Sequence, residues 1–249
     1  MKPEIKIYNS ESELFKNAAE YICSLINYFI NDFNRCTLVL SGGKTPKKLF
    51  EILSSTYKES VNWSKVYFFW GDERCVPPND SESNFRMANE YLLSKIDVTK
   101  ENIFRISAEK PPAEAAEEYE QNMKSFFGNK SIPGFDIVLL GIGNDGHIAS
   151  LFSDTSVLEI KDKWAAAVYV EKLKLQRITL TYPVFNNAKN ILLLADGKSK
   201  SDIIGKAFTD KNANLPVQKI NPAGGKFIWF LDKESSRGIL KSILKPYSK

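Results

Sequence analysis

Phe135-Asp-Ile-Val-Leu-Leu-Gly-Ile-Gly-Asn-Asp-Gly-His-Ile-Ala-Ser-Leu-Phe152 is the stretch that decides the fold. Its first part, 135–140, is apolar apart from one aspartate and predicts a buried strand. A glycine-rich turn follows, and we expect a helix to start there and to carry His147. This is the only histidine in the 249 residues. Because histidine is the side chain that titrates near neutral pH, proton chemistry in this protein has a narrow choice of base.

The same succession of apolar run, polar loop and amphipathic helix recurs along the whole chain. We expect strands at 37–40, 66–70, 103–106, 135–140, 164–170, 177–181, 190–195 and 227–231. We expect a first helix from Ser10 to about 33, because Ser10 has capping-box spacing with Glu13. A second helix should start at Pro46, which suits a first helical turn. Further helices are expected over 83–96, 112–127, 198–208 and 233–244. Alternation of this kind predicts an α/β fold with a mostly parallel sheet and helices on both faces. No Pro/Ser-rich linker or charge block divides residues 1–249, so we expect one domain.

The composition is that of a soluble globular protein, with 43% hydrophobic and 26% charged residues. A net charge of +4 from scattered lysines favours a solvated basic surface over a nucleic-acid footprint, and it would also suit small anionic substrates. Three cysteines without a CxxC pair and a single histidine offer no zinc constellation. With no N-terminal hydrophobic signal and no apolar run long enough for a bilayer, we expect a cytoplasmic protein without membrane contact.

Three loops, at 41–46, 71–75 and 141–147, each leave the carboxyl end of an expected strand. In an open parallel sheet, ligands bind beyond these strand ends. We therefore expect the three loops to converge on one crevice.

The loop 141–146 matches G-x-G-x-x-G after a strand, as in dinucleotide sites. The motif lies past mid-chain, His147 stands where the helix should begin, and no acidic residue ends a strand about twenty positions later. A nicotinamide or flavin site is therefore disfavoured.

The loop 41–46 resembles the end of a Walker A loop, but Leu38 stands where the first glycine is required and Pro46 follows directly. An ordinary tight turn remains an alternative. We favour phosphate binding, because glycines, hydroxyls, a lysine and a helix N-terminus coincide here. The candidate residues are Ser41, Gly42, Gly43, Lys44 and Thr45.

Charged residues follow two further strands. Asp72 could orient a substrate hydroxyl or a proton-transfer partner, and Arg74 could bind an anion with two hydrogen bonds, although a surface charge cluster is the alternative. Asp145 could fix the tautomer of His147 and raise its basicity, although a lone histidine is often structural. Arg177 and Lys200 each place a cation beside a strand end and could form a second pair of anion contacts.

Together these residues resemble the 6-phosphogluconolactonase family, within the wider group that includes glucosamine-6-phosphate deaminase. The matching segments span nearly the whole chain in order, at 41–46, 71–77, 83–84, 141–152, 177–181, 197–200 and 229–232. The resemblance implies a modified Rossmann-like α/β domain, in agreement with the pattern of strands and helices.

The resemblance further implies hydrolysis of 6-phospho-D-glucono-1,5-lactone to 6-phosphogluconate in the oxidative pentose phosphate pathway. His147 would be the general base that activates water, supported by Asp145, with Asp72 beside the sugar. The substrate and its phosphate would be held by Ser41, Gly42, Gly43, Lys44, Thr45, Arg74, Asn84, Arg177 and Lys200. No metal or organic cofactor is expected, the only expected partner is the small-molecule lactone, and we expect a monomer or weak homo-oligomer.

The chain departs from the family pattern at three positions. Lys44 stands where serine is usual, Ile148 where the lactonases have threonine, and Ser153 where proline is common. The deaminase branch carries a catalytic glutamate five residues after the histidine, and here that position is Phe152. A deaminase or isomerase therefore lacks its main catalytic acid, and a non-catalytic sugar-phosphate sensor is the remaining alternative.

Overall fold

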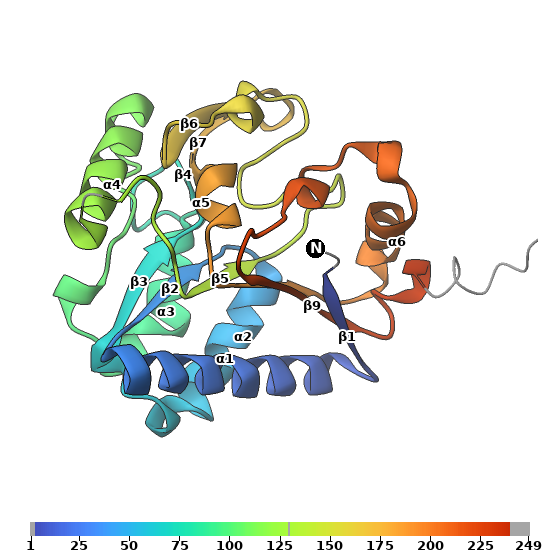
Figure 1. Cartoon of the computed structure of the whole chain (residues 1–249), viewed down its shortest axis with the longest axis horizontal. Helices are drawn as coiled ribbons and strands as arrows, with labels where there is room; N and C mark the ends of the chain where they lie inside the picture. Colours follow the sequence, from blue (N-terminus) through green and yellow to red (C-terminus); the bar gives the residue numbers. More distant parts are fainter. Residues whose placement is uncertain (1–2, 129, 240–249) are drawn as a thin grey trace, which may run out of the picture.

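Six parallel strands form the central sheet, in the order β1-β9-β8-β5-β2-β3 (Figure 1). The computed structural model describes residues 3–128 and 130–239. The six strands are β1 (Glu4–Tyr8), β2 (Cys36–Leu40), β3 (Val66–Trp70), β5 (Ile137–Leu140), β8 (Asn190–Ala195) and β9 (Lys226–Asp232). Every residue of β2, β5 and β8 is buried, because helices cover both faces of the sheet. The predicted α/β class with a mostly parallel sheet is confirmed.

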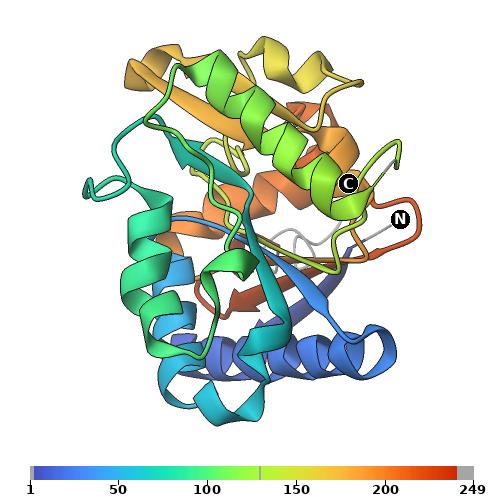
Figure 2. The ribbon, with the colours of Figure 1, turned by 90° about the vertical axis from the view of Figure 1, so that its left-hand side faces the viewer.

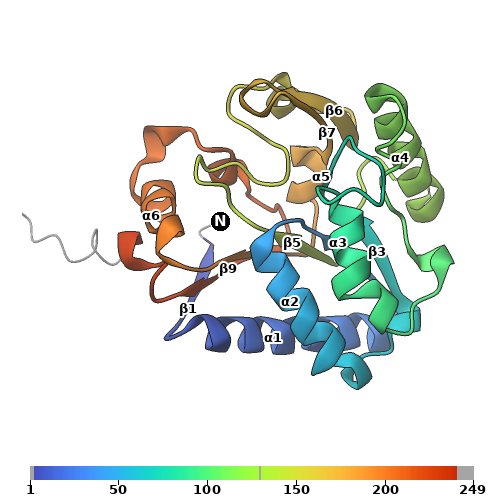
Figure 3. The same ribbon diagram turned by 180° about the vertical axis from the view of Figure 1, so that it is seen from behind.

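The helices are α1 (Glu11–Phe33), α2 (Lys44–Ser55), α3 (Asn84–Tyr91), α4 (Pro112–Phe127), α5 (Tyr182–Asn186) and α6 (Ser201–Thr209). Figure 1 shows α1 below the sheet, with α5 and α6 on its other side, and Figure 3 shows α2 and α3 on the side of α1. The backbone N–H of Glu13 donates to Ser10 Oγ at 3.2 Å, so the predicted N-cap of α1 is present. No helix of the described residues is long and apolar enough to cross a membrane.

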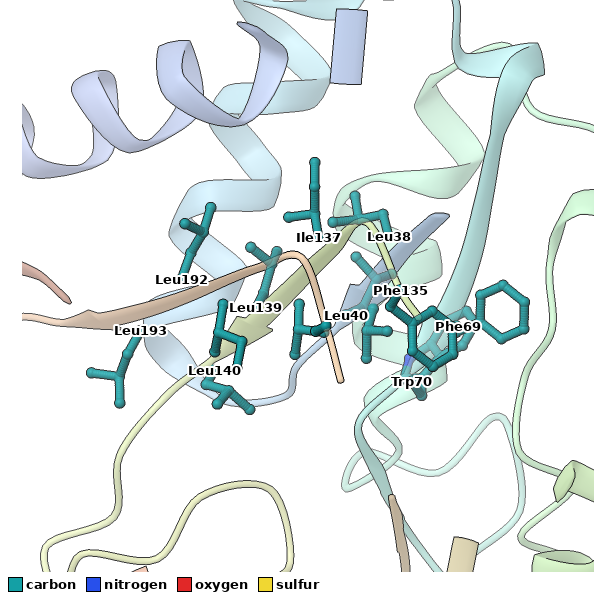
Figure 4. Close-up of a cluster of buried hydrophobic side chains, with 14 of the residues drawn as sticks. Leu38, Leu40, Phe69, Trp70, Phe135, Ile137, Leu139, Leu140, Leu192 and Leu193 are labelled. Atoms are coloured by element: carbon teal, nitrogen blue, oxygen red, sulfur yellow. The ribbon is translucent and has the colours of Figure 1, made fainter. Parts of the chain in front are cut away.

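The core lies between these layers. Figure 4 shows leucines from neighbouring strands side by side, with Leu38 and Leu40 of β2, Leu139 and Leu140 of β5, and Leu192 and Leu193 of β8. None of the six is more than 1% exposed. Close packing at the strand ends fixes where the following loops begin, and this positions the site.

A second, three-stranded antiparallel sheet was not predicted. Its order is β4 (Asp72–Arg74), β7 (Leu175–Leu180) and β6 (Ala165–Val170), and α4 packs against it (Figure 2). The sequence placed 71–75 in a loop and assigned no separate sheet to the two later strands. Only a short turn separates β6 from β7, which forces antiparallel pairing because a parallel crossover needs a dozen or more residues.

Three further expectations are wrong, and one strand was missed. Residues 141–155, after β5, form turns and no helix, because Gly146 (φ 81°) and Ala149 (φ 45°) have left-handed backbone conformations that interrupt a right-handed helix. The strand expected at 103–106 is a single bridge from Ile103 to Phe68. The helix expected over 83–96 ends at Tyr91 and is followed by a short 3₁₀ turn. Strand β1 was not predicted, and the part of the expected closing helix from 240 to 244 lies outside the described residues.

Candidate active site

A cavity of about 400 Å³ lies at the carboxyl ends of the parallel strands. The loops after β2, β5 and β8 line it, together with β4 and the start of α3. The lining includes both His147 and Asp72. It also includes every predicted binding residue, namely Ser41, Gly42, Gly43, Lys44, Thr45, Arg74, Asn84, Arg177 and Lys200. The structure therefore brings together the loops that the sequence expected to converge, and of the candidate residues only Asp145 stands behind the lining.

Asp145 contacts the imidazole from behind the cavity lining. Its Oδ1 lies 2.5 Å from His147 Nδ1, and the backbone N–H of His147 donates to the same oxygen at 3.3 Å. A carboxylate can only accept this hydrogen bond, so we assign the proton of the neutral ring to Nδ1. Nε2 is then left with a lone pair, as a general base requires.

The imidazole is held by two further contacts. Its ring stacks on Phe152, with centroids 4.0 Å apart and planes 28° apart. It also lies so close to Gly143 that a Cβ there would be 2.0 Å from Nδ1. A glycine is therefore required at position 143, because the backbone there lies against the imidazole. The sequence predicted turn glycines in this loop but did not predict this contact.

Burial, together with nearby cations, keeps His147 neutral. Burial lowers its pKa from the ordinary value of 6.5 to about 4. The carboxylate of Asp72 opposes this shift, and the cations Arg177, Lys200 and Arg74 add to it. A neutral imidazole at pH 7 can accept a proton without first losing one.

Asp72 is buried and held on both of its oxygens. Oδ2 accepts a hydrogen bond from Ser150 Oγ at 2.6 Å and lies 3.7 Å from Arg177 Nη1. Oδ1 accepts from Asn84 Nδ2 at 3.3 Å. Sequence reasoning missed Ser150, whose only signal was its place three residues after the histidine. These partners hold the Asp72 carboxylate at one edge of the cavity.

Glu73, the next residue, ties β4 to α3. Its buried carboxylate accepts from the backbone N–H groups of Arg74, Asn84 and Phe85, at 2.7 to 2.8 Å, and from Ser83 Oγ at 3.1 Å. Burial raises the pKa of Glu73, and the three backbone hydrogen bonds oppose that shift. The network sets the start of α3, so that Asn84 Nδ2 can donate to the backbone oxygen of Asp72 at 2.8 Å.

Two arginines lie side by side on the antiparallel sheet. Arg74 of β4 pairs in register with Arg177 of β7, and both line the cavity. Burial lowers the pKa of Arg177. The Nε atoms of both guanidinium groups are buried without a hydrogen-bond partner among the described residues. Two positive side chains that line one cavity are suited to an anionic ligand.

The glycine loop presents the N-terminus of α2 to the cavity. Gly43 is the N-cap residue, with φ 105° and no side-chain cap, so the first N–H groups of α2 have no acceptor within the helix. Thr45 Oγ1 donates a hydrogen bond to Asp196 Oδ1 at 2.5 Å. Its hydroxyl proton is therefore engaged, and the backbone N–H of Thr45 is the group that could donate to a ligand. Lys44 is exposed at the rim of the cavity. Lys200 Nζ donates a hydrogen bond to Asn144 Oδ1 at 2.8 Å, and burial lowers the pKa of Lys200.

The described residues offer no evident metal site. Within 3–128 and 130–239, no three His, Cys, Asp or Glu side chains are grouped so that they could hold a metal ion. The chemistry that this arrangement offers is proton transfer by one neutral base beside a cluster of anion-binding groups.

Comparison with known proteins adds independent information. A family model described as glucosamine-6-phosphate isomerases/6-phosphogluconolactonase matches residues 9–229. The probable 6-phosphogluconolactonase 1 of Arabidopsis thaliana is 35% identical over 246 residues, which cover 93% of this chain and 92% of that protein. A crystal structure of a protein named devB superposes with a TM-score of 0.87 at 33% identity, covering 96% of this chain and all of that one. The 6-phosphogluconolactonase from Trypanosoma cruzi superposes with a TM-score of 0.83 at 29% identity, covering 94% and 96%.

Proposed function

The chain belongs to the glucosamine-6-phosphate isomerase/6-phosphogluconolactonase family, and on that premise we propose that it is a 6-phosphogluconolactonase. It hydrolyses 6-phospho-D-glucono-1,5-lactone to 6-phospho-D-gluconate, in the oxidative pentose phosphate pathway. We further propose that the protein is a monomer or weak homo-oligomer and that it acts in the cytoplasm.

The observation that carries this proposal is the stack of Phe152 on His147, with centroids 4.0 Å apart. The family includes two kinds of enzyme, lactonases and deaminases. By the resemblance, the catalytic glutamate of the deaminases would stand at the position of Phe152. In this chain an apolar ring covers the imidazole at that place. The site therefore has a base but lacks the acid that ring opening of an amino sugar would need, and a lactone needs only the base.

In the proposed reaction, His147 Nε2 takes a proton from a water molecule as the water oxygen bonds to the lactone carbonyl carbon. The bond from that carbon to the ring oxygen then breaks, and the imidazolium returns its proton to the leaving alkoxide. The carboxylic acid formed loses its proton to solvent. One positioned base contributes about 10²–10⁴-fold to such a step.

Asp145 and Asp72 have different parts in this scheme. Asp145 accepts a hydrogen bond from Nδ1–H of His147 and stabilises the imidazolium while it exists. Asp72, fixed by Ser150 and Asn84, is placed to accept a hydrogen bond from a sugar hydroxyl. Arg74 and Arg177 line the cavity and can stabilise negative charge there, including the oxyanion that develops on the lactone carbonyl.

The phosphate would be bound by the glycine loop, the N-terminus of α2 and Lys200. Uncapped N–H groups at a helix N-terminus and a nearby ammonium group are the usual means of binding phosphate. Holding the phosphate orients the lactone toward His147, and orientation lowers the barrier further.

The test follows acid release from freshly prepared lactone, with and without the protein, with spontaneous hydrolysis subtracted. Marked acceleration is expected, with no ammonia released from glucosamine 6-phosphate. Ammonia release at a comparable rate would favour the deaminase reaction, and the absence of both activities with intact sugar-phosphate binding would favour a sensor.

A further inference from the structure

The turn between β6 and β7 reaches the proposed base from outside the cavity. Lys172, in the 3₁₀ turn Glu171–Leu173, forms an ion pair between its Nζ and Asp145 Oδ2. The same Nζ lies 4.6 Å from the ring centroid of Phe152. Since Asp145 holds one nitrogen of His147 and Phe152 stacks on the ring, Lys172 contacts both residues that hold the imidazole.

Neither folding stability nor substrate contact accounts for this arrangement. The side chains of Lys172 and Asp145 are 50% and 41% exposed, and ion pairs at that exposure contribute little to stability. Neither residue is among those that line the cavity. The two oxygens of Asp145 are instead divided between two partners, with Lys172 on Oδ2 and His147 on Oδ1.

We propose that Lys172 is a positioning residue that fixes the orientation of Asp145 and limits the basicity of His147. The inference rests on the proposed function, in which His147 is the general base. With Lys172 present, Asp145 cannot rotate its carboxylate without breaking the ion pair, so Oδ1 stays on Nδ1. The ammonium group also neutralises part of the charge that would otherwise favour the imidazolium.

Other charged groups also face the imidazole, and the effect of Lys172 adds to theirs. They are Asp72 and Arg74 from β4, Arg177 from β7, Lys200 from the turn before α6, and Asp145 from the histidine's own loop. Asp145 is the one among them in hydrogen-bond contact with the ring. A cation that shares this carboxylate therefore acts on the ring more directly than its exposure suggests.

The experiment uses the whole chain of residues 1–249 with Lys172→Met, Lys172→Arg and a matched control, Lys174→Asn. Lys174 is exposed in the same turn, and asparagine tolerates its φ of 48°. Because the chain has a single histidine, the NMR signals of one imidazole report its pKa without assignment, provided that no histidine tag is present. Lactone hydrolysis is measured on the same samples for kcat and KM.

Lys172→Met is expected to raise the pKa of the imidazole by about half a unit or more, the scale of one exposed unit charge acting through a bridging carboxylate. We expect kcat to fall several-fold with KM unchanged, Lys172→Arg to restore both values, and Lys174→Asn to match the wild type. A wild-type pKa and kcat in Lys172→Met would overturn the inference, and so would a change confined to KM. If the wild type does not hydrolyse the lactone, the proposed function fails, while the NMR titration still tests the role of Lys172.

Discussion

Asp145 Oδ1 lies 2.5 Å from Nδ1 of His147, in a chain that has no second histidine. The pair fixes which ring nitrogen carries the proton and leaves Nε2 as the acceptor. Asp145 itself stands outside the cavity lining, so we propose that its carboxylate acts through the imidazole and not on the substrate.

Replacement of His147 by alanine should remove the base and leave the anion site intact. We expect kcat for lactone hydrolysis to fall by about 10²–10⁴-fold. Binding of 6-phosphogluconate, measured by calorimetry, should stay within a few-fold of the wild type, because other residues hold the phosphate. Full activity in this variant would exclude His147 as the base.

The pKa of His147, about 4, makes a prediction for pH dependence. Because the folded-state pKa lies below the ordinary 6.5, the neutral ring contributes stability above pH 6.5 that is lost as the pH falls toward 4. The same protonation removes the base, so kcat/KM, which reports the free enzyme, should fall with a midpoint near pH 4 after correction for ionisation of the substrate phosphate. A midpoint near 6.5, in kinetics or in NMR titration of the single imidazole, would contradict this pKa.

Much of this architecture could be predicted from sequence alone. Apolar runs such as 66–70 and 190–195 correspond to strands with the predicted bounds, because a strand buried on both faces must be apolar throughout. The family was identified correctly from motif order. Convergence of the loops followed from the rule that parallel strands present their carboxyl ends at one edge of a sheet.

The remaining features depend on contacts that are distant in sequence. Strand β4 has three residues, and its pairing with β7 joins positions more than 100 residues apart, so no local period could reveal it. His147 lies in turns rather than in a helix because Gly146 and Ala149 adopt positive φ, which a G-x-G-x-x-G pattern does not distinguish from a helix start. Ser150 and Lys172 were missed because their partners, Asp72 and Asp145, are recognisable only in three dimensions.

Alanine at Gly143 should displace the imidazole. The added Cβ would lie 2.0 Å from His147 Nδ1 and 2.7 Å from Asp145 Oδ1, so the ring must leave its position. We expect kcat to fall by about 10²-fold or more, as though the base were lost, with the thermal unfolding curve measured to confirm folding. Gly224→Ala is the control, because a Cβ there meets nothing within 4 Å and Gly224 does not line the cavity. Equal activity in the two variants would show that ring position does not limit the rate.

Removal of the Ser150 hydroxyl should loosen Asp72. Ser150→Ala deletes the 2.6 Å hydrogen bond to Oδ2 and leaves a buried carboxylate oxygen without that donor. A hydrogen bond to a charged group contributes about 1.5–3 kcal/mol, so we expect kcat/KM to fall about tenfold or more. Ser153→Ala, at an exposed position three residues later, should behave as the wild type. If Ser150→Ala retained full kcat/KM, the position of Asp72 would not matter for the reaction.

Substitution of Lys200 and of Lys198 would show which of the two lysines binds the phosphate. Both lie in the 3₁₀ turn Lys198–Lys200 after β8, but only Lys200 lines the cavity, where it is half-buried, whereas Lys198 is exposed. Lys200→Met should raise KM by about 10–100-fold, the equivalent of one charge-assisted hydrogen bond, and change kcat much less. Lys198→Met removes the same charge two residues away and should leave KM unchanged, which separates a direct contact from the general positive potential of the site. Equal increases in KM for both variants, abolished at high salt, would assign the effect to long-range electrostatics instead.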